Sequence, residues 1–144
     1  MSPRPITSAA LLVALTVMVH AVGLMAIFRW VSRSHLAEAK SFWGGTWLVV
    51  RVAWALLLVH VIEIGTWAIF YWQNQSMPDL ESAIYFSGVT YTSVGYGDLV
   101  LVRPWRVLAP IEALTGLLMG GLSTGFFFAL VTSLVAKVRQ GEGH

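Results

Sequence analysis

Residues 92–98, with the sequence TSVGYGD, carry the most informative chemistry in the chain. Gly95 and Gly97 lack a Cβ atom, so the backbone there can adopt conformations that other residues avoid. Because these glycines alternate with Val94 and Tyr96, successive carbonyl groups can point to one side. Carbonyl oxygens aimed at a common axis can replace the water around a dehydrated cation. One chain supplies only one wall of such a site, so the stretch predicts several copies of the chain around an axis.

The composition of the chain is that of a membrane protein. Of the 144 residues, 57% are hydrophobic and 11% are charged, whereas soluble domains carry about 25% charged residues. A helix needs about 20 consecutive apolar residues to cross a bilayer, and residues 9–28, 47–72 and 105–136 form runs of sufficient length. The net charge of +2 is too small to suggest a nucleic-acid partner. The absence of cysteine excludes disulfides and thiolate-bound metals.

Residues 1–45 are predicted to form an extra N-terminal transmembrane helix and a linker. The apolar run 9–28 contains no Lys, Arg, Asp or Glu. A signal peptide is the alternative interpretation, but the run is long for one and no clear cleavage site precedes Arg29. The run also lacks the row of arginines that a voltage sensor carries. We therefore expect a retained membrane helix.

The distribution of basic residues predicts how the chain is oriented. Arg29, Arg33 and Lys40 lie in the linker, and Lys137 and Arg139 follow the last apolar run. Short cytoplasmic loops are enriched in lysine and arginine. We therefore expect the N-terminus outside and the C-terminus in the cytoplasm, in a multi-pass protein of the plasma or inner membrane.

Residues 80–91 are too few and too polar to cross a membrane, yet they precede the glycine stretch directly. Pro78 and Asp79 are typical of a helix start. The segment is predicted to be a short helix that enters the membrane and stops at residue 91. Non-helical backbone at that depth survives only when it is buried in protein or lines an aqueous cavity. The C-terminal end of the helix would bring partial negative charge toward a cation.

The order of these segments resembles the pore domain of potassium channels of the two-transmembrane type. In that comparison the chain has an outer helix at 46–72, a pore helix at 80–91, a selectivity filter at 92–98 and an inner helix at 105–137. The resemblance covers about residues 46–137 and assigns residues 46–144 to the pore domain. It implies an all-α membrane protein with three transmembrane helices and a re-entrant pore helix, assembled as a homotetramer in the lipid bilayer.

The function implied by this resemblance is passive, potassium-selective conduction. It involves no enzymatic step and no cofactor other than potassium ions in the filter, and neither a voltage sensor nor a cytoplasmic ligand domain is expected. The ion-binding residues would be Thr92, Ser93, Val94, Gly95, Tyr96 and Gly97. Potassium would be coordinated by the carbonyl groups of Ser93, Val94, Gly95 and Tyr96 and by the Ser93 hydroxyl. Ser93 stands where threonine is usual, which predicts a weaker innermost site.

The resemblance also indicates residues that support the filter, namely Tyr85, Phe86, Thr90 and Asp98, and Glu112 joins them as an acid within the last apolar run at about the depth of the pore helix. Phe86 stands where many relatives have a tryptophan whose N–H holds the filter tyrosine, and phenylalanine has no donor. Tyr96 must then rely on another partner, for which Thr90 is a candidate. Tyr85 can donate to Asp98. Glu112 is expected to be held by a hydrogen bond behind the filter.

The inner helix contains glycines at 116, 120, 121 and 125. Their small-xxx-small spacing favours close helix packing, and the resemblance offers a second interpretation in which Gly116 is a gating hinge. One helical face would then line the cavity with Leu117, Gly120, Thr124 and Phe128. The alternative is that the phenylalanines at 126–128 simply face lipid.

Ionisable residues within the apolar runs are functional candidates. His60 and Glu63 share a helical face, which leaves a pH-sensing role open. His20 is expected to be a packed helix residue. From sequence, His20, His60 and Glu63 are too scattered to indicate a metal site.

Two other functions remain open at this point. The chain could be a non-conducting accessory subunit that has kept a channel-like hairpin, or a weakly selective cation channel. An enzyme is not indicated, because the sequence contains no nucleophile–base pair, metal-ligand cluster or phosphate-binding loop. The intact filter motif favours conduction over the accessory role.

Overall fold

The computed structural model describes residues 4–34 and 42–141, and these are helical apart from short connections, with no strand in either range. Three of the helices are long and apolar enough to cross a membrane, which confirms the all-α membrane fold. The elements in chain order are α1 (Arg4–Ser34), α2 (Phe42–Gln73), α3 (Leu80–Tyr91), the short 3₁₀ helix η2 (Trp105–Val107) and α4 (Leu108–Gly141).

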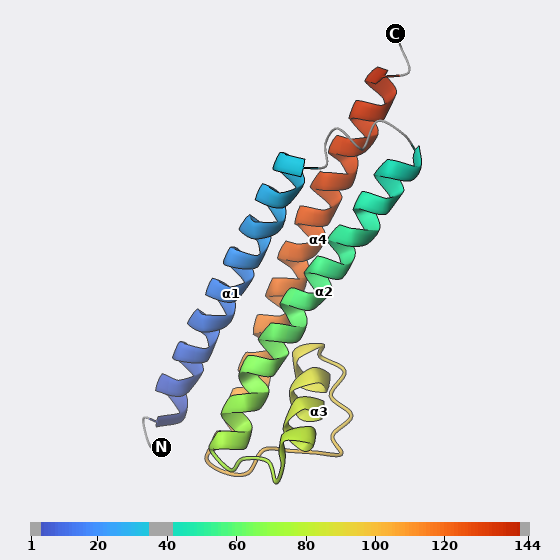
Figure 1. Cartoon of the computed structure of the whole chain (residues 1–144). Coiled ribbons are helices and arrows are strands. Elements are labelled where there is room, and N and C mark those ends of the chain that lie inside the picture. Colours follow the sequence, from blue (N-terminus) through green and yellow to red (C-terminus); the bar gives the residue numbers. More distant parts are fainter. Residues whose placement is uncertain (1–3, 35–41, 142–144) are drawn as a thin grey trace.

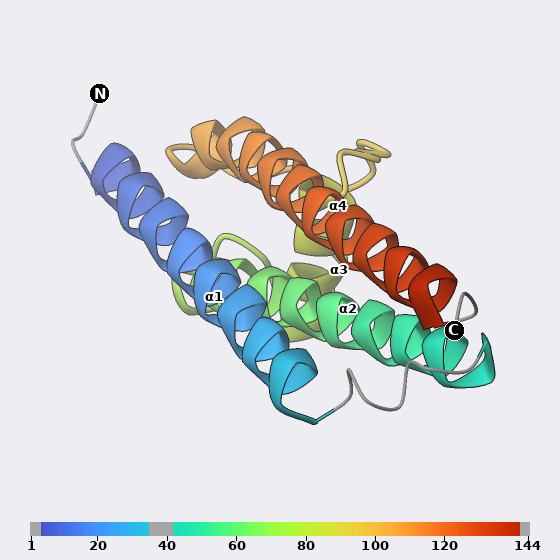
Figure 2. The same cartoon turned by 90° about the horizontal axis from the view of Figure 1, so that it is seen from above.

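The three long helices lie side by side, with α2 antiparallel to both α1 and α4 (Figure 1). The short helix α3 packs beside the second half of α2 and against α4. The N-terminus of α1 lies at the end of the molecule where α3 begins, and the C-terminus lies at the opposite end (Figure 1). Viewed from above, α1 runs along α2 and α4 (Figure 2), and it contacts both of them.

The helix boundaries follow the predicted ones closely. The predicted pore helix at 80–91 coincides with α3, and Asp79 caps it as expected, because its side chain accepts from the backbone N–H of Ser82. The outer helix begins at Phe42 rather than at residue 46. The inner helix opens with the 3₁₀ turn η2 and continues to Gly141 rather than ending at 137. Both helices therefore extend beyond the stretch that the apolar run defines.

The buried apolar side chains form two clusters. The first joins α1, α2 and α3 to the start of α4 and includes Leu12, Trp67, Phe86 and Leu108. The second cluster lies nearer the end of the molecule where α4 ends, and it joins α1, α2 and α4 through residues such as Val52 and Leu134. Polar and ionisable side chains are also buried between the helices, namely Thr16, His20, Glu63, Ser87, Glu112, Thr115 and Ser123. Buried polar groups need hydrogen-bond partners, and all of these residues except Thr115 bond to a neighbouring helix.

Two glycines allow helices to approach closely. A Cβ atom at Gly23 on α1 would lie 2.6 Å from a methyl carbon of Val59 on α2. A Cβ atom at Gly116 on α4 would lie 2.0 Å from the carbonyl oxygen of Tyr91, the last residue of α3. The close-packing interpretation of Gly116 is therefore confirmed. The glycines at 120, 121 and 125 do not make such close contacts within one chain, because a Cβ atom at each of them would have no neighbour within 4 Å.

Candidate functional site

The backbone of the glycine stretch alternates between two conformations. Ser93, Gly95 and Gly97 have positive φ angles of 60°, 51° and 78°, whereas Val94 and Tyr96 between them do not. Because residues with positive and negative φ alternate, the backbone does not wind into a helix. Successive carbonyl groups can therefore point to the same side. The sequence predicted this freedom for the two glycines. The sequence did not predict a positive φ for Ser93. A non-glycine residue in the left-handed region costs roughly 1–2 kcal/mol, and serine as a residue type does not signal this conformation.

The stretch is anchored on the C-terminal end of α3. The backbone N–H of Thr92 donates to the carbonyl of Gly88 at 3.2 Å, and that of Ser93 donates to Thr90 at 2.9 Å. The N–H of Gly95 donates to the carbonyl of Val89 at 3.0 Å. These bonds use carbonyl groups that the end of a helix leaves without intrahelical partners. The stretch therefore begins directly at the negative end of the α3 dipole.

The far end of the stretch is tied back to α3 by one side-chain hydrogen bond. The hydroxyl of Tyr85 donates to Asp98 Oδ2 at 2.8 Å, which confirms the predicted contact. This bond raises the pKa of Tyr85, because the neighbouring carboxylate favours the protonated phenol. The stretch is thus held at both ends by the same short helix.

Glu112 lies behind α3 and is fully buried. It accepts from the Tyr71 hydroxyl at 2.6 Å and from the Ser87 hydroxyl at 2.5 Å. The expectation that a hydrogen bond holds this acid is therefore confirmed, and the contact joins α4 to α2 and α3. Phe86 packs edge-on against Tyr71, with ring centroids 5.4 Å apart. Phe86 thus belongs to the core between α2 and α3.

The expected partner of Tyr96 is not found within one chain. No hydrogen bond joins Tyr96 to Thr90 among the residues that the structure describes, and Tyr96 is 72% exposed. Val94 is also half exposed, at 52%. A single chain therefore leaves the side chains of this stretch uncovered.

The inner-helix residues named from sequence lie partly together. Leu117, Gly120 and Thr124 line a hollow of about 540 Å³ that also includes Thr92 at the start of the glycine stretch. Phe128 is not part of this lining and is 70% exposed. The phenylalanines at 126 and 127 are partly buried against the second apolar cluster.

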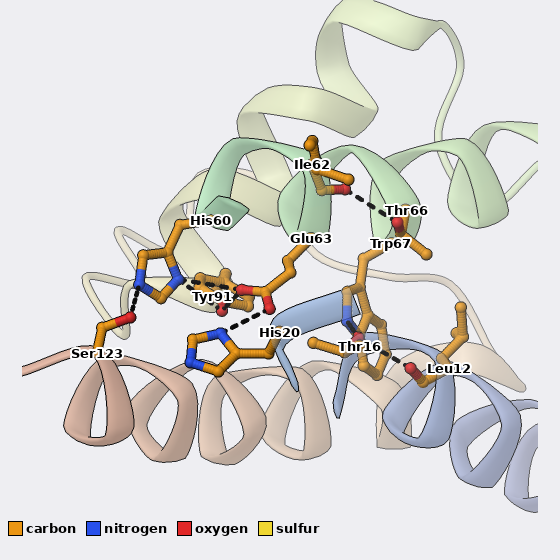
Figure 3. A network of polar contacts seen from close by, with 10 residues as sticks. All are labelled: Leu12, Thr16, His20, His60, Ile62, Glu63, Thr66, Trp67, Tyr91 and Ser123. Carbon is orange, nitrogen blue, oxygen red and sulfur yellow. Dashed lines mark hydrogen bonds and ion pairs between the residues drawn. The ribbon is translucent and has the colours of Figure 1, made fainter. Parts of the chain in front are cut away.

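The structure also assembles a polar group that sequence reasoning did not find. His20, His60 and Glu63 were too scattered to suggest a common site, yet their side chains meet where α1 crosses α2 (Figure 3). The Tyr91 and Ser123 hydroxyls complete the group. Helical spacing could relate His60 to Glu63, but only the packing of α1 on α2 brings in His20.

Three long apolar helices, with a short helix that packs against two of them and ends in an irregular glycine-containing stretch, define a channel-type membrane protein. Comparison with known families agrees with this class, because residues 56–135 match a family described as "Ion channel". The match covers more than half of the chain, and the chain belongs to this ion channel family. The matched region includes α3 and the glycine stretch, whereas α1 lies outside it.

One curated relative is Protein LctB of Bacillus caldotenax. It is 30% identical to this chain over 95 residues, a match that covers 62% of this chain and 71% of the relative. No solved structure matches the chain.

Proposed function

We propose that this chain is the subunit of a potassium-selective channel in which residues 92–98 form the selectivity filter and residues 92–97 bind the ions. The observation that carries the proposal is the alternating backbone of this stretch, with positive φ at Ser93, Gly95 and Gly97. Such a backbone can present successive carbonyl oxygens to an ion that has lost its water. Potassium would bind to the carbonyl groups of Ser93, Val94, Gly95 and Tyr96 and to the Ser93 hydroxyl.

The electrostatics of α3 support a cation at this position. The carbonyl end of α3 meets the start of the filter, and the partial negative charge of a helix C-terminus favours a nearby cation. The Tyr85–Asp98 bond and the buried Glu112 hydrogen bonds support the proposal that these residues hold the filter in place.

An assembly of several chains follows from the proposed role, because one chain can provide only one wall of an ion pathway, and the resemblance to potassium channels implies four. The exposure of Val94 and Tyr96 in the single chain supports this arrangement. In the proposed homotetramer, Leu117, Gly120 and Thr124 line the cavity below the filter, and Phe128 forms a narrower apolar ring. Gly116 serves as a close contact with α3 and as the hinge of the inner helix.

The proposed setting is the cell membrane, with the N-terminus outside and the C-terminus in the cytoplasm. The basic residues of the linker and those after residue 136 support this orientation. The ends of the chain also fit, since the N-terminus lies at the end where α3 begins and the C-terminus at the opposite end (Figure 1).

Reconstitution into liposomes tests the proposal. Purified protein should carry potassium down its gradient faster than sodium down an equal gradient. Gly95→Ala places a side chain at a φ of 51° and should lower the potassium flux strongly. Gly65→Ala on α2 is the matched control, because a Cβ atom there meets nothing within 4 Å, and it should conduct like the wild type.

The other outcomes of this experiment identify the alternatives. Equal fluxes of the two ions would show a weakly selective cation channel. An absence of flux from a correctly assembled tetramer would show a non-conducting accessory subunit. Chemical cross-linking of the protein in liposomes measures the assembly separately, and a largest species of four chains is expected.

A further inference from the structure

A buried polar cluster at the centre of the helix bundle lies next to the proposed cavity, and the proposed conduction assigns it no role. It contains His20 from α1, His60 and Glu63 from α2, Tyr91 from the end of α3 and Ser123 from α4 (Figure 3). All four helices therefore contribute to one small group of side chains. Ionisable residues are costly inside a membrane and mark functional sites.

The carboxylate of Glu63 lies between the two histidines. His20 Nδ1 is 2.9 Å from Glu63 Oε1, and His60 Nδ1 is 3.0 Å from Glu63 Oε2. One ligand atom from each of the three residues can be chosen so that all lie within 4.8 Å of one another. Ligands of a tetrahedral zinc ion are about 3.3–3.5 Å apart, given bonds of about 2.0–2.2 Å. Side-chain rotations that draw the group together by roughly an ångström would therefore close it around one ion.

The burial of the group favours a bound cation. Glu63 is fully buried and His20 is 1% exposed, and a buried carboxylate requires a positive partner. The Nε2 atom of His20 is buried without any hydrogen-bond partner among the described residues. Turning the His20 ring would offer this nitrogen to a metal. His20 thus faces the Glu63 carboxylate with Nδ1 and keeps a second buried nitrogen, Nε2, that a metal ion could satisfy.

We propose that His20, His60 and Glu63 form a binding site for a divalent transition-metal ion, with zinc as the expected metal. Two histidines and one glutamate are an established zinc ligand set, which leaves a fourth position for another oxygen. The Tyr91 hydroxyl lies 3.0 Å from His60 Nδ1 and also donates to Glu63, so it or a water molecule occupies that position.

A hydrogen-bond partner outside the ligand set orients His60. Its Nε2 atom lies 3.0 Å from the Ser123 hydroxyl on α4. When Nε2 carries the proton and donates it to Ser123, the lone pair of Nδ1 is free to bind the metal. Outer partners of this kind fix the tautomer of metal-binding histidines. Ser123 is thus a positioning residue for the site.

The site would attach α1 to the rest of the molecule. His20 lies outside the region that matches the ion channel family, whereas the other members lie within it. His60 and Tyr91 both line the hollow of about 540 Å³ that includes Thr92, which gives the metal a route to the site. The bound ion would therefore join α1 to the residues directly preceding the filter.

Metal binding to the purified full-length protein tests this inference without reference to conduction. Titration with Zn²⁺ should show one tightly bound ion per chain. His20→Gln and His60→Gln should each weaken binding more than 10-fold, and Ser123→Ala should weaken it about 10- to 100-fold. The matched control is the double variant His35→Gln/His144→Gln, which removes the two remaining histidines of the sequence and should bind zinc like the wild type.

A spectrum of the unaltered protein provides a second test that does not depend on the folding of a variant. Co²⁺ should give the intense visible bands of a tetrahedral site, and Zn²⁺ should abolish them. The weak spectrum of the hydrated ion would overturn the proposal. Equal zinc affinity of the wild type and His20→Gln would also overturn it, as would loss of binding in the His35→Gln/His144→Gln control.

Discussion

Gly116 on α4 provides the sharpest test of how the inner helix meets α3. A Cβ atom at this position would lie 2.0 Å from the carbonyl oxygen of Tyr91, 2.9 Å from its carbonyl carbon and 3.0 Å from the first atom of its ring. Ordinary Cβ contacts begin at about 3.4 Å, so Gly116→Ala must push α4 away from α3 by more than an ångström. Since the obstacle is backbone rather than a flexible side chain, it cannot simply rotate aside.

The cost of Gly116→Ala follows from two opposing terms. Overpacking costs about 1–3 kcal/mol, and we expect about 3 kcal/mol here because the obstacle is rigid backbone, while the better helix propensity of alanine returns about 1 kcal/mol. We expect a net destabilisation of about 2 kcal/mol, which corresponds to a fall in unfolding temperature of about 4–8 °C for a chain of this size. The displaced end of α3 should also disturb residues 92–97 and reduce ion flux.

Thermal unfolding of the detergent-purified protein, followed by circular dichroism, measures this effect. Gly65→Ala on α2 is the matched control, because it makes the same change in a long helix with nothing within 4 Å of the new Cβ atom. This control should unfold at or slightly above the wild-type temperature. If Gly116→Ala proved as stable as Gly65→Ala, the close contact between α4 and α3 would not exist.

Three further changes test the contacts that hold α3 and the filter. Asp79→Ala removes the N-cap of α3 and should lower the free energy of unfolding by about 0.5–2 kcal/mol. The control Glu81→Ala, in the same turn, should lower the unfolding temperature by less. Equal falls in the unfolding temperature would argue against the cap. Tyr85→Phe removes the hydrogen bond to Asp98 and should make the potassium flux in liposomes decay faster with time. An unchanged rate of decay would show that this hydrogen bond does not maintain the filter. Glu112→Ala leaves the buried Tyr71 hydroxyl without its acceptor and should lower the free energy of unfolding by about 1–3 kcal/mol. Glu112→Gln keeps an acceptor oxygen and should lower it by less. A Gln variant as unstable as the Ala variant would refute this explanation.

Features that depend on local chemistry could be predicted from the sequence. The three long helices follow from the length of their apolar runs. The limits of α3 follow from Asp79 at its start and from the change to glycine-containing backbone after residue 91. The early start of α2 at Phe42 was missed, because a helix can continue past the bilayer core and the apolar run marks only the part inside it.

Features that depend on packing between helices could not be predicted. His20 and Glu63 are 43 residues apart, and hydrophobic periodicity does not say which residues of α1 face which residues of α2. The contact between Gly116 and the carbonyl of Tyr91 depends on the position of α4 along α3 in the same way. Ser93 shows a different limit, because its left-handed backbone comes from the turn that ends α3 and not from any preference of serine.

The reversal potential of the reconstituted channel shows whether residues 92–97 select potassium over sodium. Purified protein is placed in a planar bilayer with potassium salt on one side and an equal concentration of sodium salt on the other. If residues 92–97 bind dehydrated potassium through their carbonyl groups, the current should reverse at a large potential, with the sodium side positive. Replacing sodium by potassium should return it to zero. A reversal potential near zero with the two different salts would show that residues 92–97 do not select potassium over sodium.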